Sequence, residues 1–190
     1  MRFIKDNEFI RGKCPMTKED VRTLSIVRMD IKEDSKVLDI GAGTGSISIQ
    51  SALLCPRGKI ISIEKNVEAS NIIKQNIEKF NVKNVELIIG DANSPQVFDK
   101  VEGKFDSIFI GGSDGNIEDI ISKYSDKLNE NGNLVMNFIT VINLYKAIEA
   151  LENNGFSYEC IQASTGKLRG KKGMIMANNP IFILKATKTL

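Results

Sequence analysis

The sequence predicts an α/β fold of three layers, in which helices cover a seven-stranded, mostly parallel sheet with one reversed strand in a C-terminal hairpin. Short apolar segments alternate with segments whose apolar residues recur at helical spacing, which is typical of a parallel sheet. The last two strands have no helix between them, so they must pair as a hairpin. We expect a single domain over residues 1–190, with an N-terminal lead and capping helix (1–35) before a core (36–190).

The individual elements follow from the spacing of apolar residues. Thr17 and Asp20 have the spacing of a capping box, which predicts a helix that begins at Thr17 and packs through Val21, Leu24 and Val27. Other helices are expected from position 46 and over 66–80, 117–128 and 144–152, and a loop or broken helix over 94–103. Strands are expected over 37–40, 59–64, 85–89, 105–110, 134–138, 156–162 and 180–186, with a turn around Gly132.

The fold is organised around residues 36–50, which read KVLDIGAGTGSISIQ. A buried strand turns through Gly41, Gly43 and Gly45 into a helix. Such a turn presents free backbone N–H groups and the positive end of a helix dipole, and glycine lets a ligand lie directly on the backbone. The pattern alone is also compatible with an ordinary connection between a strand and a helix.

Two further signals fall at the same edge of the predicted sheet. Glu64 ends the second strand roughly 20 residues beyond the glycines, the spacing expected when a carboxylate hydrogen-bonds a ribose. Asp91 and Ala92 follow the third strand. Taken singly, Glu64 fits a solvated strand end and Asp91 a helix cap. Ligands of open parallel sheets bind beyond the carboxyl ends of the strands, so together these residues predict a bound nucleoside.

The composition excludes several kinds of function. The chain has no histidine, so it can hold no Ser-His or Cys-His nucleophile system, no histidine base and no histidine-ligated metal. We predict no metal site, and the sequence names no catalytic residue. The net charge of +2 is interspersed and Trp is absent, which argues against a nucleic-acid partner. Three scattered cysteines and the lack of a long apolar run favour a cytoplasmic protein with no membrane partner.

The stretch DIGAGTG (39–45) resembles the first motif of the class I S-adenosylmethionine-dependent methyltransferases, whose fold is Rossmann-like. Ser46 stands where the dinucleotide-binding pattern has its last glycine. The resemblance implies S-adenosylmethionine as cofactor. It assigns Glu64 to the ribose hydroxyls and Asp91 with Ala92 to the adenine edge. The methionine part falls to the glycine turn and its flank, namely Asp39, Gly41, Ala42, Gly43, Thr44 and Gly45.

A second stretch, RGKCPMTKEDVR (11–22), resembles the decarboxylating corrin methyltransferases of cobalamin biosynthesis, as does DIGAGTGSISIQ. The resemblance implies that Thr17 contacts the cofactor. It also implies methylation of a cobalt-precorrin at carbon 15, loss of carbon dioxide from the ring C acetate, and a homotetramer. An RNA or protein methyltransferase of the same fold, and a cofactor-binding module without activity, remain alternatives. The Asn- or Asp-Pro-Pro-Tyr element of base-methylating enzymes is absent after the fourth strand.

The acceptor candidates are a glycine pair and two basic stretches. Gly111 and Gly112 follow the fourth strand, where they would form a flat floor for a macrocycle or a plain flexible loop. Arg11, and Lys167 with Arg169 in the hairpin loop 163–178, would pair the carboxylates of a corrin precursor at its rim. The basic loop also fits a solvated hairpin tip. The apolar residues 174–176 beside it favour self-association instead.

Overall fold

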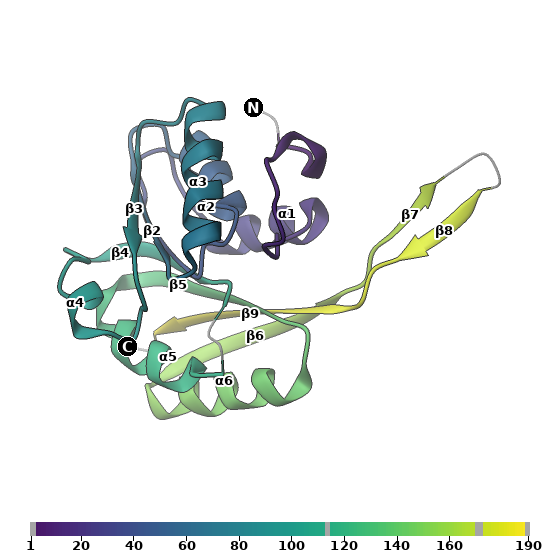
Figure 1. Ribbon diagram of the computed structural model, residues 1–190. Coiled ribbons are helices and arrows are strands. Elements are labelled where there is room, and N and C mark those ends of the chain that lie inside the picture. The colour runs from purple at the N-terminus through teal and green to yellow at the C-terminus, as the bar shows by residue number, and fades with distance from the viewer. Residues whose placement is uncertain (1–2, 113–114, 170–172, 189–190) are drawn as a thin grey trace.

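The computed structural model describes residues 3–112, 115–169 and 173–188 (Figure 1). Its main sheet has seven strands in the order β3-β2-β1-β4-β5-β9-β6, and β9 runs antiparallel to both of its neighbours. The predicted fold class is therefore confirmed. The strands are β1 (Lys36–Ile40), β2 (Lys59–Glu64), β3 (Val85–Ile89), β4 (Phe105–Ile110), β5 (Leu128–Phe138), β6 (Phe156–Ala163) and β9 (Ile181–Lys188).

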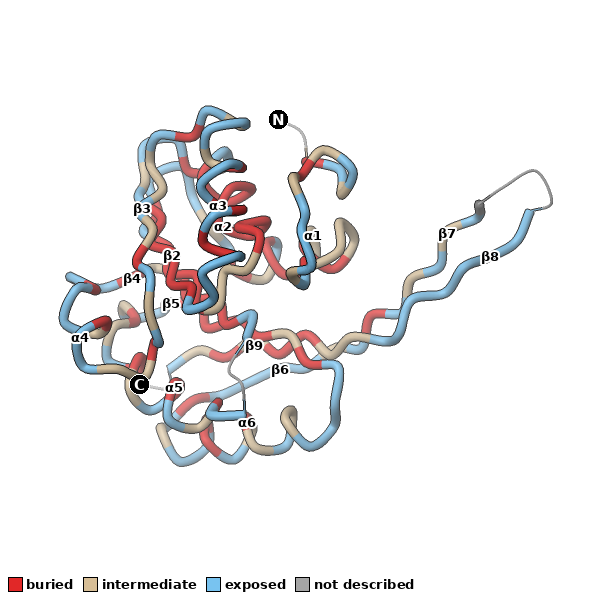
Figure 2. Tube along the Cα trace, viewed as in Figure 1, coloured by how far each residue is buried: buried red, intermediate tan, exposed pale blue. Residues whose placement is uncertain are grey.

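Helices cover both faces of this sheet. One face carries α1 (Glu19–Met29), α2 (Ser46–Leu54) and α3 (Val67–Lys79), and the other carries α5 (Ile117–Tyr124), α6 (Val141–Asn153) and the short α4 (Pro95–Phe98) (Figure 1). The strands alternate between the two cores that result. In β1, Val37 packs with α1 and α2, whereas Leu38 and Ile40 pack toward α5. Figure 2 shows the buried residues concentrated along the central strands and the helix faces that meet them.

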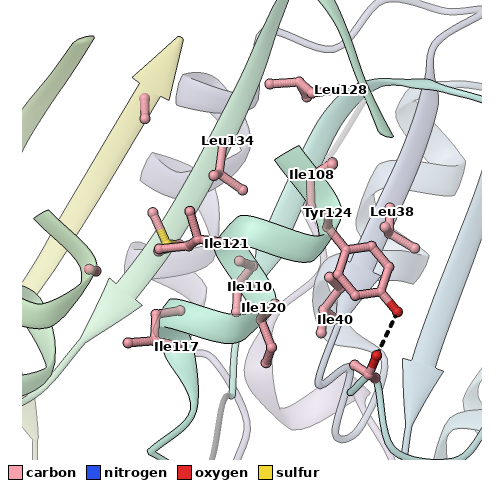
Figure 3. Packing of buried hydrophobic residues seen from close by; sticks show 14 of the residues in the cluster. Leu38, Ile40, Ile108, Ile110, Ile117, Ile120, Ile121, Tyr124, Leu128 and Leu134 are labelled. Carbon is pink, nitrogen blue, oxygen red and sulfur yellow. Dashed lines mark hydrogen bonds between the residues drawn. The ribbon is translucent and has the colours of Figure 1, made fainter. Parts of the chain in front are cut away.

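The core beneath α5 ties that helix to the end of β3. Ile117, Ile120 and Ile121 pack with Leu38 and Ile40, one helical turn after another (Figure 3). Tyr124 is 1 % exposed, and its hydroxyl donates to the carbonyl of Ala92 at 2.9 Å. A buried tyrosine hydroxyl requires such a partner. The bond fixes the loop that follows β3, which contains Asp91 and Ala92 of the predicted nucleoside site.

The start of α1 differs from the prediction. The helix begins at Glu19 with Lys18 at the N-cap position, so Thr17 does not cap it. The free amide of Glu19 donates instead to Oδ1 of Asp6, at 2.8 Å, from a short 3₁₀ turn (Asp6–Glu8) in the lead. The predicted packed side is also wrong in part, because Val27 is 62 % exposed. The buried positions of α1 are Val21, Arg22, Ser25, Ile26 and Met29.

Three other boundaries differ from the prediction. The helix predicted over 117–128 ends at Tyr124, a 3₁₀ turn (Ser125–Lys127) follows, and Leu128 already belongs to β5. The predicted turn around Gly132 is a bulge within β5, where the register with β4 jumps from the Phe105–Leu128 pair to the Ser107–Asn133 pair. The last helix begins three residues early, at Val141, because the Thr140 side chain caps it.

The predicted loop 163–178 contains two strands. Gly166–Arg169 (β7) pairs antiparallel with Met174–Ala177 (β8), and this hairpin, the arm, projects away from the body in Figure 1. Four apolar side chains of the arm, Leu168, Met174, Ile175 and Met176, are each more than half exposed. Among the described helices, none combines the length and apolar character that a membrane crossing requires.

Candidate functional site

A cavity of about 250 Å³ opens at the carboxyl ends of β1, β2, β3 and β4. Its walls come from the turn after β1, the end of β2, the loops after β3 and β4, and the lead. Eight of the predicted cofactor residues line it: Thr17, Asp39, Gly41, Ala42, Gly43, Glu64, Asp91 and Ala92. Thr44 and Gly45 do not, because both are buried behind the turn.

Gly43 and Gly41 of the turn each lie where a side chain would crowd the backbone of another segment. Gly43 has φ +58°, and a Cβ there would lie 3.1 Å from the carbonyl oxygen of Pro15 in the lead. A Cβ on Gly41 would lie 2.8 Å from the backbone nitrogen and oxygen of Gly112. The turn after β1 is therefore in backbone contact with the loop after β4. The two glycines among the acceptor candidates, Gly111 and Gly112, line the cavity at this contact.

Glu64 closes one side of the cavity. Its side chain is buried, and Oε2 accepts from the amide of Gly43 at 2.7 Å while Oε1 accepts from the amide of Asn66 at 2.8 Å. The carboxylate therefore reaches from the end of β2 to the glycine turn, a contact that the sequence did not predict. Each carboxylate oxygen can accept a second hydrogen bond, so Glu64 keeps acceptor capacity for a ligand hydroxyl beside the Gly43 amide.

Asp39 is the buried charge of the site. It is 1 % exposed, the Ser48 hydroxyl donates to its Oδ2, and Ser62 in turn donates to Ser48 at 2.8 Å. Its Oδ1 is buried with no hydrogen-bond partner in the described part of the chain. Burial raises the pKa of Asp39 from 3.8 to about 7, against the Ser48 hydrogen bond and with a small contribution from the charge of Glu64. A buried, unpaired carboxylate oxygen beside a cavity suits a cationic ligand group.

The lead forms the remaining wall and is held by Arg22. Pro15, Met16 and Thr17 line the cavity. The fully buried guanidinium of Arg22 donates to the carbonyl of Thr17 at 2.8 Å and to that of Ile4 at 2.5 Å. It also pairs with Asp6 at 3.2 Å. Sequence reasoning missed this role, although Arg22 ends the distinctive segment 11–22.

Asn76 on α3 is a second missed residue. It is fully buried, and its amide nitrogen donates to the carbonyls of Ile10 at 2.9 Å and Thr44 at 3.0 Å. Its oxygen accepts from the amide of Ile10 at 2.8 Å. One side chain thus joins the lead to the glycine turn. The available signal was a polar residue on the packed face of a helix, next to Ile72 and Ile73.

The remaining candidates are Asp91, at the rim of the first cavity, and the basic residues, which lie outside it. Asp91 is exposed and accepts from the amide of Asn93 at 2.8 Å, at the cavity rim. Arg11 and Lys167 line a second cavity of about 440 Å³, between the lead and the base of the arm. Arg169 ends β7, but its side chain lies outside the described residues.

Comparison with known proteins identifies the family. Residues 8–188 match the model of the precorrin methyltransferase domain. A relative from Sulfolobus acidocaldarius, named "Probable cobalt-precorrin-6B C(15)-methyltransferase (decarboxylating)", is 38 % identical over 189 residues, which cover 97 % of each chain. The chain belongs to the precorrin methyltransferase family. This confirms the resemblance first found in residues 11–22 and in the glycine turn.

Two solved structures are similar to this precorrin methyltransferase over nearly the whole chain. The precorrin-6y C5,15-methyltransferase from Geobacter metallireducens is 35 % identical, with a TM-score of 0.92 over 98 % of this chain and 96 % of that one. The precorrin 8w decarboxylase from Methanobacterium thermoautotrophicum is 26 % identical, with a TM-score of 0.88 over 96 % and 98 %.

Proposed function

We propose that this precorrin methyltransferase transfers a methyl group from S-adenosylmethionine to carbon 15 of a cobalt-precorrin and couples the transfer to decarboxylation of the ring C acetate. The observation that carries the proposal is the first cavity, lined by the glycine turn, the buried Asp39 and Glu64, in a chain of this family. The acceptor is inferred from the relatives, which are named as decarboxylating cobalt-precorrin-6B methyltransferases.

The residues that line the first cavity fit the parts of this cofactor. Asp39 offers a buried, unpartnered Oδ1 to the ammonium of the methionine part. Glu64 offers carboxylate oxygens to the ribose hydroxyls, and Asp91 with Ala92 forms the wall toward which the adenine would extend. The cofactor, when bound, supplies an electrophilic methyl group on a sulfonium.

The contribution of the chain is then binding and orientation. Chemistry supplied by a cofactor needs the protein chiefly to align the reacting atoms. Thr17 and Met16 close the cavity from the lead side, held by Arg22. Gly111 and Gly112 contribute no side chain to the opposite rim, where a flat macrocycle would approach the methyl group. The chain has no histidine, so no histidine takes up or gives a proton.

We also propose that the protein acts as one domain in the cytoplasm, without a nucleic-acid or membrane partner, and forms a homotetramer. The exposed apolar residues of the arm support self-association, since such a surface favours contact with another protein surface. Three free cysteines, Cys14, Cys55 and Cys160, support a reducing compartment.

The test uses methyl-labelled S-adenosylmethionine and purified cobalt-precorrin-6B. Mass spectrometry should show a product that has gained one labelled methyl group in place of hydrogen and lost carbon dioxide. Transfer RNA and a mixture of acidic and basic proteins serve as competing acceptors. Label that appears in RNA or protein, with none in the tetrapyrrole, would refute the proposed acceptor. Failure to bind S-adenosylhomocysteine would refute the proposed cofactor.

A further inference from the structure

The second cavity lies at the same edge of the sheet as the first. β6 and β5 are both antiparallel to β9, so β6 runs in the same direction as β1 and β4. The arm therefore begins at the carboxyl edge, where the first cavity opens. Lys167, Met176 and Asn178 at the base of the arm form one wall of the second cavity, and residues of the lead form the other.

One segment of the lead separates the two cavities. Met16 and Thr17 face the first cavity, and the next residue, Lys18, lines the second. Arg22 holds this partition through the Thr17 carbonyl. A ligand that lies over Thr17 would therefore reach both cavities at once.

The second cavity carries an excess of positive charge. Arg11 and Lys18 have no side-chain partner among the residues that the structure describes. Lys167 forms ion pairs with Asp20 at 3.6 Å and with Glu19 at 3.8 Å, so the uncompensated cations of the cavity are Arg11 and Lys18. The acidic residue that lines the cavity, Asp6, is already paired with Arg22 and with the Glu19 amide.

We propose that the second cavity binds the carboxylate side chains of the tetrapyrrole acceptor while the ring lies at the mouth of the first. The inference rests on the proposed function and adds a binding site for the anionic periphery of its substrate. Guanidinium and ammonium groups bind carboxylates through charge-assisted hydrogen bonds, and the guanidinium of Arg11 allows bidentate geometry. The amides of Asn7 and Asn178 offer further neutral donors at the same rim.

Binding of uroporphyrin, a planar tetrapyrrole with carboxylates around its ring, tests this site without turnover. The variant Arg11→Ala/Lys18→Ala removes two cations of the cavity. The matched variant Lys13→Ala/Lys74→Ala removes the same charge from exposed positions that do not line it. Porphyrin fluorescence should give a dissociation constant raised roughly tenfold or more in the first variant and within about twofold of wild type in the second.

The affinity for S-adenosylhomocysteine, measured by calorimetry on the same proteins, should stay unchanged in both variants. That measurement separates this inference from the proposed function, because a wild type that binds no S-adenosylhomocysteine refutes the latter alone. Equal loss of porphyrin affinity in the two variants would overturn the inference, since only general charge attraction would remain. A wild type that binds no uroporphyrin, or binds its neutral methyl ester equally well, would also overturn it.

Discussion

Asp39→Asn should remove a specific pH dependence of stability. The carboxyl group has a pKa of about 7 in the folded protein and an ordinary value of 3.8 when exposed. Between these values the folded state holds a proton that the unfolded state has released. Stability contributed by the protonated group is therefore complete below pH ~4 and is lost as the pH rises to about 7.

The magnitude follows from the size of the shift. Each pKa unit corresponds to about 1.4 kcal/mol, so the loss is at most about 4 kcal/mol between pH ~4 and ~7. The asparagine side chain keeps the shape and does not titrate, so the stability of Asp39→Asn relative to wild type should rise over the same interval. The chain has no Trp, so unfolding by urea is best followed by circular dichroism at several pH values. Parallel pH profiles of the two proteins would refute the argument.

A ligand cation that binds Oδ1 of Asp39 should lower the pKa that burial has raised. Pairing with an ammonium favours the ionised carboxylate and lowers the pKa of Asp39. Binding of S-adenosylhomocysteine to wild type at pH 6 should therefore release a proton, measured by calorimetry in two buffers of different ionisation enthalpy. The Asp39→Asn protein should release none.

Three further outcomes are expected. Gly43→Ala should strongly weaken S-adenosylhomocysteine binding in calorimetry. Gly103→Ala should leave it unchanged, because Gly103 also has a positive φ but has open space around the added Cβ. Equal affinities of the two variants would show that the turn is not part of the site. Arg22→Met should lower the free energy of unfolding by about 3–5 kcal/mol in urea titrations, because it leaves the carbonyls of Ile4 and Thr17 without their donor and Asp6 without its ion pair. A loss under ~1 kcal/mol would contradict this. Replacing residues 174–176 by Ser should reduce the mass found by light scattering, and a monomeric wild type would disprove self-association.

The sequence predicted the parts of the fold that depend on local pattern. The parallel strands and the glycine turn follow from short apolar runs bounded by Gly, Pro and polar residues, and the boundaries of β2, β3 and β4 agree with the prediction. Thr17 failed as a cap because Asp6, thirteen positions before Glu19, accepts from the Glu19 amide. The predicted helix extended to Leu128 because this residue continues the helical spacing of apolar residues. In the structure Leu128 belongs to a strand.

Some residues of the candidate site could be predicted from the sequence, and others could not. Glu64 could be placed from its distance to the glycines, because the order of β1 and β2 fixes both at one edge. Asn76 could not, since its partners, Ile10 and Thr44, are distant in sequence and lie on two other segments. The two basic stretches could be recognised singly, but only the path of the arm brings Lys167 near Arg11.

The tethering of the lead has a consequence for the growing polypeptide on the ribosome. The amide of Ile4 bonds Gln50, and Ile10 bonds Asn76, so the wall of the first cavity needs partners that are synthesised much later. Until α2 and α3 have emerged, Ile4 and Phe9 have no core to enter and stay exposed to water. The docking of α3 is therefore a necessary step before a ligand can bind, and the loops after β3 and β4 must follow it to complete the cavity. A ribosome stalled before Asn76 should carry a nascent chain that binds no ligand.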